Sequence, residues 1–369
     1  MPSFAPYALV VALSVAAWAI AERFKLPASG FLGPLLLVGA GAILGLPQPV
    51  YPDWSILLLQ ITFGGFLGCQ ADRDSVARVR ALGRPVALAT AWTIVSAFVI
   101  ALLLAGLTRL DMTSSFLSAV PGGVAEMSAM SISMEANTAI VAALQSLRVI
   151  ATMGLVPLLS TRIMIANGGY PAATGAGTSA AARGSAVSSE PYLVDDVPAR
   201  WHLWGRNHTA GWLATLAVGL VGGLLCTYLQ VPAGGILGSM ATVAIGRIAG
   251  MGLQKPPPVL RLVALMGMGS YVGTSFSAQT LLQLRDIALA AVLVTAATVG
   301  SGMALAKVLE RYFGMDAPTA LLACAPAGVT QMAVIADEIG SDVLVVTLFQ
   351  LTRLMSCVFI LPMIYAFVT

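Results

Sequence analysis

Charged side chains are scarce in this sequence. Asp, Glu, Lys and Arg make up 9% of its 369 residues, against about 25% in an average globular domain. Hydrophobic residues make up 58%, and the mean hydropathy is +0.89. So little charge could not keep a soluble surface of this size hydrated, which excludes an ordinary water-soluble protein. The composition predicts an integral membrane protein, with the lipid bilayer as its main partner.

Motifs for several kinds of chemistry are also missing. The sequence has no C-x-x-C pair and no ATP-binding motif, and nothing resembles a helix-turn-helix or a basic groove for nucleic acid. The 2 histidines, His202 and His208, lie outside the apolar segments, so they could not hold a metal within the membrane. We therefore expect no cofactor, no metal, no nucleic-acid partner and no enzymatic activity. The 4 isolated cysteines are expected to be small buried hydrophobic residues: Cys69, Cys226, Cys324 and Cys357.

The second half of the sequence repeats the first. PGGVAEM from Pro121 has the counterpart PAGVTQM from Pro326, and LQSLR ending at Arg148 has the counterpart FQLTR ending at Arg353. Each matched pair is separated by 205 residues, without a gap. So long an ungapped register indicates an internal duplication. Residues that differ by 205 in number are called sister residues below.

The duplication divides the chain into three parts. Residues 1–160 and 211–369 are expected to be two homologous transmembrane repeats. Between them, residues 161–210 are rich in Ala, Gly, Ser and Pro and end in aromatic and cationic residues, which predicts a flexible linker with an anchor at headgroup level. Each repeat holds six apolar stretches, which in the first repeat are about 7–21, 31–47, 54–70, 85–107, 112–133 and 138–160.

The fifth stretch of each repeat does not have the pattern of a continuous helix. Residues 112–133 have Pro-Gly-Gly at their centre and Glu126 soon after, all of which weaken a helix in lipid. We therefore expect an all-α fold in which each repeat has about five transmembrane helices and one broken or re-entrant segment, 112–133 and 317–338. The sequence leaves open whether these segments re-enter or cross. Asp111 and Asp316, just before them, are expected to be helix N-caps.

Positive charge favours inverted repeats. If the N-terminus is outside and the repeats are inverted, the inside receives fifteen of the 19 Lys and Arg residues and the outside only Arg109 and Arg285. Arg148 and Arg353 then lie within the membrane. Parallel repeats would put the arginines of the linker outside, against the positive-inside rule. We therefore expect an outside N-terminus and a cytoplasmic linker.

Two arginines are predicted near the membrane midplane. Arg148 lies about ten residues into its helix, and Arg353 is its sister. Gln145 and Gln350 precede them by three residues, which places amide and guanidinium on one helical face. A charge at this depth costs roughly 2.5–3.5 kcal/mol, so each should face protein, water or ligand. Either the arginines bind the carbonyls of the broken helices or pair with an acid, or they bind an anionic substrate directly.

The broken segments offer a second set of candidate residues. Backbone that leaves the helix at membrane depth can present free N–H and C=O groups to a solute, and glycine permits a close approach. Inversion would bring the two segments together. The candidate substrate-binding residues are therefore Pro121, Gly122, Gly123, Gln145, Arg148, Pro326, Gly328, Gln331, Gln350 and Arg353.

The repeats differ at acidic positions. Glu126 has Gln331 as its sister, and Asp342 has Asn137. A single acid in an otherwise symmetric pair is a candidate for coupling to H⁺ or Na⁺, because burial would move its titration toward the working range. The alternative is a structural partner for one of the arginines. Glu126 is the first coupling candidate and Asp342 the second.

The doubled PGG-x-x-EM element, followed by Q-x-x-R and a late proline, resembles the AbrB family of membrane proteins. The resemblance covers both repeats, about residues 7–160 and 212–367, and the second motif departs from the pattern at Ala327 and Gln331. It implies a polytopic protein of the bacterial inner membrane. Members are labelled regulators of gene expression or ammonia monooxygenases, although the family shares its name with an unrelated soluble DNA-binding regulator.

From these features we expect a secondary transporter that moves a small anionic organic solute by alternating access, coupled to H⁺ or Na⁺. The alternative is a membrane-embedded ligand sensor that affects gene expression through a partner, with the linker as its contact surface. A monooxygenase would need a metal centre, and the positions of the histidines argue against one. A homodimer is compatible with either function.

Overall fold

The computed structural model describes residues 4–24, 26, 28–71, 82–166, 209–231 and 233–368. Within these ranges all regular structure is helical, and six helices are long and apolar enough to cross a bilayer. The six spans are Pro6–Arg23, Gly83–Leu107, Thr138–Val156, Gly211–Tyr228, Ala288–Phe313 and Val343–Ile360. The chain is therefore an all-α, multi-pass membrane protein, as its composition predicted.

Both repeats run through the same series of helices. The first contains α1 (Phe4–Arg23), α2 (Ser29–Ile43), α3 (Asp53–Gly68), α5 (Gly83–Leu107), α6 (Met112–Ala119), α7 (Val124–Ser133) and α8 (Thr138–Ala166). The second contains α9 (Thr209–Tyr228), α10 (Gly234–Ala249), α11 (Pro258–Thr274), α12 (Ala278–Asp286), α13 (Ala288–Phe313), α14 (Ala317–Cys324), α15 (Val329–Glu338) and α16 (Val343–Val368). Most of the predicted linker, 161–210, lies outside the described residues.

The duplication is also visible in the backbone conformation. Positive φ angles occur at three pairs of sister positions, where the chain turns before or after a helix. Such angles are unfavourable for residues with a side chain, so they do not recur by chance. The three pairs are Ala28 (φ 50°) with Ala233 (φ 55°), Gly45 (φ 79°) with Gly250 (φ 88°), and Glu135 (φ 53°) with Gly340 (φ 71°).

A short helix lies between two apolar stretches of the second repeat. The stretch after α11 forms α12, whose N-cap Ser277 exchanges hydrogen bonds with Thr280 in a capping box. Gln283 of α12 accepts a hydrogen bond from the Asn137 side chain, at 3.3 Å. The short helix therefore ties the second repeat to the turn that precedes α8.

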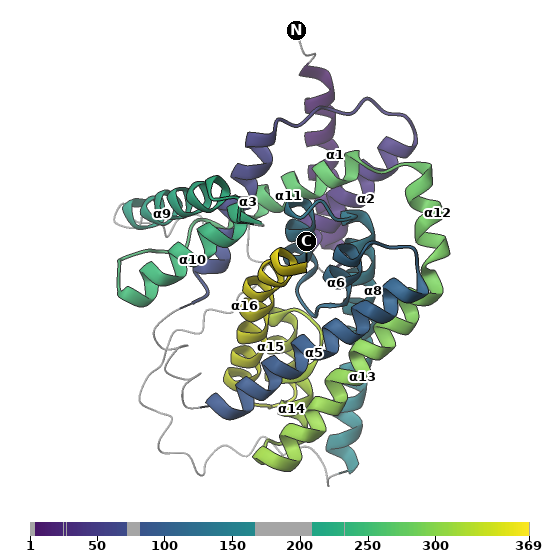
Figure 1. Cartoon of the computed structure of the whole chain (residues 1–369), viewed down its shortest axis with the longest axis vertical. Coiled ribbons are helices and arrows are strands. Elements are labelled where there is room, and N and C mark those ends of the chain that lie inside the picture. Colours follow the sequence, from purple (N-terminus) through teal and green to yellow (C-terminus); the bar gives the residue numbers. More distant parts are fainter. Residues whose placement is uncertain are drawn as a thin grey trace.

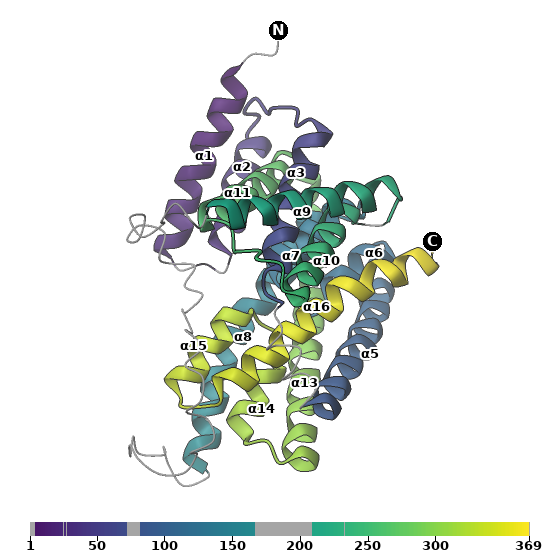
Figure 2. The ribbon, with the colours of Figure 1, turned by 90° about the vertical axis from the view of Figure 1, so that its left-hand side faces the viewer.

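The helices form two bundles, and each bundle draws helices from both repeats (Figures 1 and 2). The scaffold bundle consists of α1, α2, α3, α9, α10 and α11, and the hairpin bundle consists of α5–α8 and α13–α16. In the scaffold bundle α2 packs on α11 while α3 packs on α10, which are reciprocal contacts between sister helices. Such reciprocity is the mark of a two-fold relation between the repeats. Contacts between the bundles include those of α7 with α10 and of α7 and α8 with α11.

The sister helices α5 and α13 pack antiparallel in the hairpin bundle. Val86, near the start of α5, belongs to the same buried cluster as Leu309, near the end of α13. Further along, the Trp92 indole N–H donates to the Ser301 hydroxyl at 3.0 Å. The later part of α5 clusters with the start of α13. Residue numbers therefore rise along one helix as they fall along the other.

Each predicted broken segment is a helical hairpin. The Ser114 hydroxyl at the start of α6 accepts a hydrogen bond from the Asn137 N–H, beyond the end of α7, at 2.8 Å. In the second repeat the Thr319 hydroxyl accepts one from the Asp342 N–H at 3.1 Å. Each segment therefore returns to where it began, and its tip is the turn between its two short helices.

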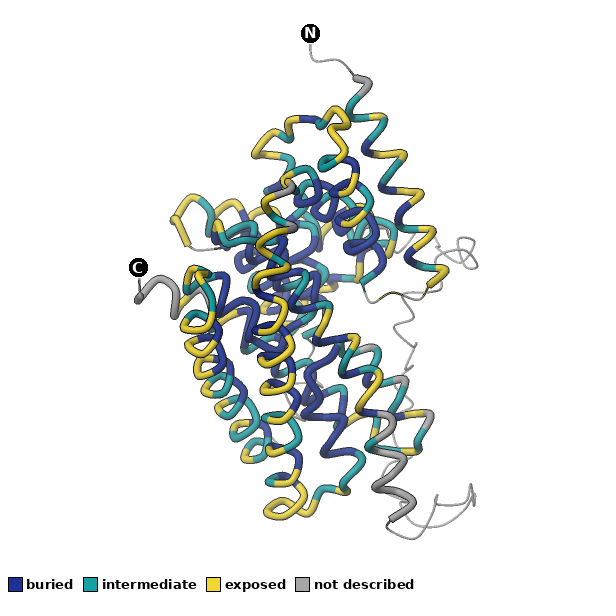
Figure 3. The backbone as a smooth tube through the Cα atoms, turned by 90° about the vertical axis from the view of Figure 1, so that its right-hand side faces the viewer, coloured by how far each residue is buried: buried dark blue, intermediate teal, exposed yellow. Residues whose placement is uncertain are grey.

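The start of each hairpin is capped as predicted. The Asp111 carboxylate accepts from the Ser114 N–H at 2.8 Å, and the Asp316 carboxylate accepts from the Thr319 N–H at 3.0 Å. An acid at this position satisfies an N–H group that the helix leaves free. Most residues of α6 and α7 are buried, and Figure 3 shows buried residues gathered in the interior while exposed residues follow the outer helices.

Candidate functional site

The two hairpin tips are short non-helical turns, residues 120–123 and 325–328. Glycine is required in both by close packing. A Cβ on Gly122 would lie 2.6 Å from the Met127 methyl carbon, and one on Gly123 would overlap the Glu126 carboxylate. In the second tip a Cβ on Gly328 would overlap the Gln331 amide oxygen. Both turns therefore accommodate a polar side chain against a glycine.

Gln145 and Gln350 hold the first arm of each hairpin. The Gln145 amide N–H₂ donates to the carbonyls of Leu117 and Val120 at 2.7 and 3.0 Å. Gln350 does the same for Leu322 and Ala325, at 2.8 and 3.0 Å. These carbonyls are among the acceptors that the ends of α6 and α14 leave without a helical partner. Both glutamines are fully buried, so their role in the structure is to close the ends of the broken helices.

Arg148 joins the two tips. It donates to the Val120 carbonyl at 2.8 Å and the Gly122 carbonyl at 2.7 Å, and it also contacts the Gln145 amide oxygen. Its Nε–H donates to the carbonyl of Pro326, in the other tip, at 3.2 Å. All three nitrogens of this guanidinium therefore have protein acceptors. The side chain is 2% exposed, so a solute could not reach it without movement of the tips.

Arg353 makes the sister contacts but lacks the last one. It donates to the carbonyls of Ala325 at 2.9 Å and Ala327 at 3.2 Å, and to the Gln350 amide oxygen. Its Nε–H is buried and has no hydrogen-bond acceptor within the described residues. The sister contact would have used the carbonyl of Pro121. The two arginines therefore differ by one unsatisfied donor.

The electrostatics of the tips explain how two cations are buried together. The C-terminal ends of α6 and α14 point at the guanidinium groups, and a helix C-terminus carries about half a negative charge. The hydrogen-bond acceptors of Arg148 and Arg353 in the described residues are carbonyl and amide oxygens, all of them neutral. The two arginines lie close together, since Arg148 binds the Pro326 carbonyl and Arg353 binds the carbonyls of Ala325 and Ala327 on either side of it. The tips therefore carry net positive charge that dipoles offset only in part.

Glu126 makes the first tip different from the second. It is the third residue of α7 and lies half-buried against Gly123. An acid in the first turn of a helix is favourable because the N-terminus is positive. Helix α11 of the scaffold bundle packs against α7 and carries Arg261, whose charge is opposite to that of an ionised Glu126. The sister side chain Gln331 lies in the same place in the second tip but carries no charge.

All the predicted substrate-binding residues lie in the two tips or contact them through their side chains. Glu126 also contacts a tip, whereas Asp342 does not. The structure puts Asp342 at the exposed start of α16, where its carboxylate accepts from the Val345 N–H at 3.0 Å. Arg353 lies about 16 Å further along that helix, from a rise of 1.5 Å per residue. Asp342 is therefore an N-cap residue outside the tip region.

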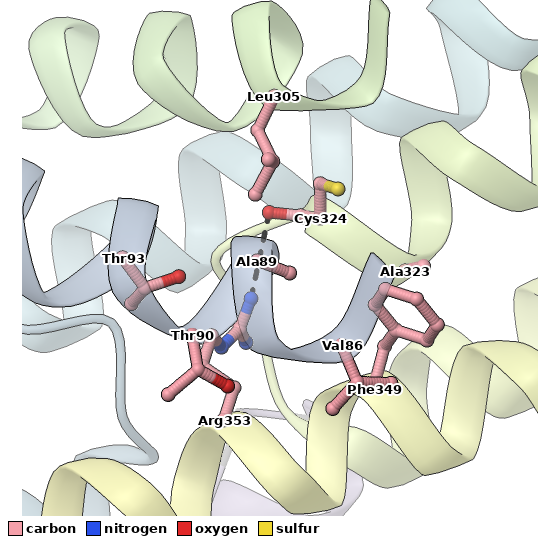
Figure 4. A pocket seen from close by; sticks show the side chains of 9 residues that line it. All are labelled: Val86, Ala89, Thr90, Thr93, Leu305, Ala323, Cys324, Phe349 and Arg353. Atoms are coloured by element: carbon pink, nitrogen blue, oxygen red, sulfur yellow. Dashed lines mark hydrogen bonds between the residues drawn. The ribbon is translucent and has the colours of Figure 1, made fainter. Parts of the chain in front are cut away.

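A small cavity adjoins the second tip (Figure 4). The space open to the centre of a water molecule is about 10 Å³, roughly what one water needs. The Arg353 side chain rises from α16 between α5 and α14, with Thr90 beside it. The lining residues are Val86, Ala89, Thr90, Thr93, Leu305, Ala323, Cys324, Phe349 and Arg353.

Comparison with known proteins agrees with this architecture. The family described as "Transition state regulatory protein AbrB" matches the chain in two parts, residues 1–164 and 168–369. The chain belongs to the AbrB family. The division of the match at the linker is consistent with the duplication.

Two AbrB-family relatives extend over much of the chain. "Putative regulator AbrB" of Escherichia coli K12 is 26% identical over 352 residues, which cover 93% of this chain and 91% of that protein. "Uncharacterized protein YhjN" of Bacillus subtilis 168 is 24% identical over 264 residues, which cover 70% of this chain and 64% of that protein. No solved structure matches the chain.

Sequence reasoning missed part of the site in this AbrB-family protein. Thr90 and Thr93 of the cavity have the sisters Thr295 and Thr298, so the offset of 205 residues could have identified them as a repeated polar pair in apolar helices. The cavity itself gave no sequence signal. Among the described residues, no group of three or more His, Cys, Asp or Glu side chains could hold a metal ion.

Proposed function

We propose that this protein is a secondary transporter that moves a small organic anion across the bacterial inner membrane by alternating access. The observation that carries the proposal is the meeting of the two hairpin tips, where Arg148 of one repeat binds the Pro326 carbonyl of the other. Broken helices whose free backbone groups meet inside the membrane are typical solute sites of transporters with inverted repeats. The buried positive charge of the tips favours an anion.

The proposed topology is an inverted pair of repeats. A hairpin that enters and leaves on the same side leaves five crossings in each repeat, and an odd number inverts the second repeat. The antiparallel packing of α5 and α13 supports this arrangement. It requires the helices of 15–17 residues in the scaffold bundle, α2, α3, α10 and α11, to cross as well. At about 23–26 Å they would need a locally thinned bilayer. The N-terminus is then outside and the linker cytoplasmic.

The proposed movement is a displacement of the hairpin bundle against the scaffold bundle. Both tips and both arginines belong to the hairpin bundle, so a substrate held there would travel with it. Between the bundles, α7 contacts α10 and α11, and α8 contacts α11, and apolar side chains of both bundles form one buried cluster. An apolar interface has few directional bonds to break, which would allow one bundle to slide against the other as a rigid body.

The proposed coupling group is Glu126, which would bind H⁺ or Na⁺. It lies in the first tip, where its carboxylate would be attracted to Arg261 of α11 across the interface between the bundles. Neutralising its charge would weaken that attraction, so occupancy by a cation would be linked to the movement of the bundles. Gln331 could not take this role, because an amide does not change its charge.

The test of the proposed function is flux in proteoliposomes. Purified protein would be reconstituted and given an inward H⁺ gradient, then an inward Na⁺ gradient, with a panel of radiolabelled mono- and dicarboxylates outside. We expect at least one anion to accumulate above its external concentration and to lose that accumulation when an uncoupler or ionophore removes the gradient. Accumulation unaffected by either gradient, or no accumulation by a folded protein, would contradict the proposal.

A ligand sensor that acts on gene expression through a partner is the second candidate. The name of the relative from E. coli, a regulator, favours it. The discriminating observation is ligand binding without flux: a stabilising ligand that is never transported would favour the sensor. Transport of that ligand, in turn, would make any regulatory effect a consequence of flux.

A further inference from the structure

The cavity beside the second tip has features of a ligand site that its sister region lacks. The Arg353 side chain is 8% exposed, and its buried Nε–H has no acceptor within the described part of the chain. A buried donor without a partner is costly, since its desolvation is not offset. Arg353 lines the cavity, so this side chain faces a space that a ligand could occupy (Figure 4).

Two hydroxyl groups on α5 line the same cavity. Thr93 is buried and Thr90 half-buried, and neither hydroxyl takes part in a hydrogen bond among the described residues. A threonine in a helix commonly bonds to the carbonyl four residues before it. The sister residue Thr298 does so, donating to the Val294 carbonyl at 2.8 Å. On α5 the hydroxyls remain free to donate to a ligand.

From these groups we infer that the cavity is an anion subsite in which Arg353, Thr90 and Thr93 donate to a compact anion, either a halide or one end of a carboxylate. This inference rests on the proposed function and names which of the two tips takes the anion. The charge decides against a bound water. Arg148 and Arg353 bind adjacent carbonyls of the second tip, and their acceptors in the described residues are all neutral, so a negative charge would offset their repulsion, which a water cannot do.

The sister region around Arg148 offers fewer free donors. The Arg148 Nε–H is engaged by the Pro326 carbonyl, and the Thr298 hydroxyl by its own helix. In addition, Glu126 lies at the first tip, and its carboxylate form would repel an anion. The cation is therefore expected at the first tip, at Glu126, and the anion at the second tip, at Arg353.

The test is anion-dependent thermal stability of the purified full-length protein in detergent. Sodium chloride and sodium acetate would be titrated against sodium gluconate at constant ionic strength. We expect chloride or acetate to raise the melting temperature and gluconate, which is too large for the cavity, to have no effect. Chloride alone would identify a halide site, and acetate an end-on carboxylate site. No difference between the three salts would overturn the inference.

Two valine variants locate the subsite. Thr93→Val removes one proposed donor with almost no change in volume, and Thr298→Val is its matched control in the sister position. We expect Thr93→Val to weaken the apparent affinity for the anion by about tenfold, the loss of one hydrogen bond to a charged group. Thr298→Val should leave the affinity within about twofold of the wild type. Equal effects of the two substitutions would overturn the inference.

The flux assay separates this inference from the proposed function. If the protein shows coupled flux but Thr93→Val does not change its anion affinity, the transporter function is supported and the anion binds elsewhere. If the anion effect depends on Thr93 but the protein shows no flux, the subsite is supported and the transporter function is contradicted. An Arg353→Lys variant, which has no Nε–H, adds a second measurement: we expect it to lose the anion effect while still melting cooperatively.

Discussion

The two hairpins of this protein share one backbone arrangement but differ in their polar side chains. In both, a buried glutamine and a buried arginine bind the carbonyls of the tip, and an aspartate caps the start. They differ in whether the residue against the tip glycine is an acid, as Glu126 is, or an amide, as Gln331 is. They also differ in one donor, because Arg148 reaches the opposite tip and Arg353 does not. A duplicated fold can therefore acquire one tip suited to a cation and one suited to an anion by changing only a few side chains.

The largest expected effect concerns the two arginines. Arg148→Ala leaves the buried Gly122 and Pro326 carbonyls without their donor and removes one of the donors to the Val120 carbonyl, and a buried unsatisfied group costs about 1–3 kcal/mol. We expect a loss of several kcal/mol in the free energy of unfolding and a greatly reduced yield of folded protein. Arg353→Ala should cost less, because it removes no contact between the tips. Thermal unfolding in detergent would compare the two, and a more damaging Arg353→Ala would contradict the assignment of Arg148 as the link.

The second-largest effect is expected on coupling, when the acid of the first tip is replaced by the amide that the second tip has. Glu126→Gln gives the first tip the residue of the second, and we expect it to abolish the dependence of flux on the cation gradient, a loss of about tenfold or more in accumulation. Counterflow that needs no gradient should survive. Flux measurements in proteoliposomes with and without a gradient test this, and an unchanged response to the gradient would remove Glu126 as the coupling group.

The opposite substitution, an acid in place of the amide of the second tip, tests anion binding there. Gln331→Glu introduces a carboxylate at the second tip, and its repulsion should weaken anion binding by about tenfold in a partly desolvated site. Gln331→Met, similar in length but uncharged, is the control and should bind the anion nearly as well as the wild type. The anion titration by thermal shift distinguishes them. Equal weakening by both variants would mean that the amide itself, rather than the absence of charge, matters.

A smaller effect is expected where the hairpins close. Thr319→Val removes the acceptor of the Asp342 N–H, and Ser114→Ala removes the acceptor of the Asn137 N–H. Each should lower the free energy of unfolding by about 1 kcal/mol and speed amide exchange at the hairpin base. Hydrogen exchange measured by mass spectrometry would show this locally. Exchange that stays unchanged at both bases would mean that packing alone closes the hairpins.

The smallest expected effect comes from one backbone position. Glu135 has a positive φ, and its sister is Gly340, which has open space around its Cα. Glu135→Gly should stabilise the protein by up to about 1 kcal/mol, because glycine has no penalty in this conformation, while Gly340→Ala should destabilise it by about the same amount. Melting temperatures of the two variants should therefore shift in opposite directions. A shift in the same direction would contradict a backbone explanation.

Much of the site was predictable because most of its features occur twice in the sequence, once in each repeat. Proline and glycine at the centre of an apolar stretch predicted the breaks in 112–133 and 317–338, and the N-caps Asp111 and Asp316 followed from their positions. The arginines were recognisable because a charge in an apolar helix is costly. Helix α12, whose apolar pattern is weak, was not predicted; Ser277 and Thr280 begin it with a capping box. Asp342, a coupling candidate from the alignment of the repeats, lies at an exposed helix start.

The sequence by itself determined the membrane environment, the duplication, the helix breaks and the residues that gather at the tips, because these follow from composition, periodicity and local backbone chemistry. Only the tertiary structure decided which donor of which arginine is satisfied and which threonine hydroxyl remains free. The arginine contacts depend on acceptors from distant parts of the chain, as when Arg148 meets Pro326. The threonine contacts depend on the conformation of each side chain in its helix, since Thr298 bonds to the Val294 carbonyl. Arg148 and Arg353 occupy matching positions in similar local sequences, so the difference between their Nε–H groups arises from how the two repeats pack together.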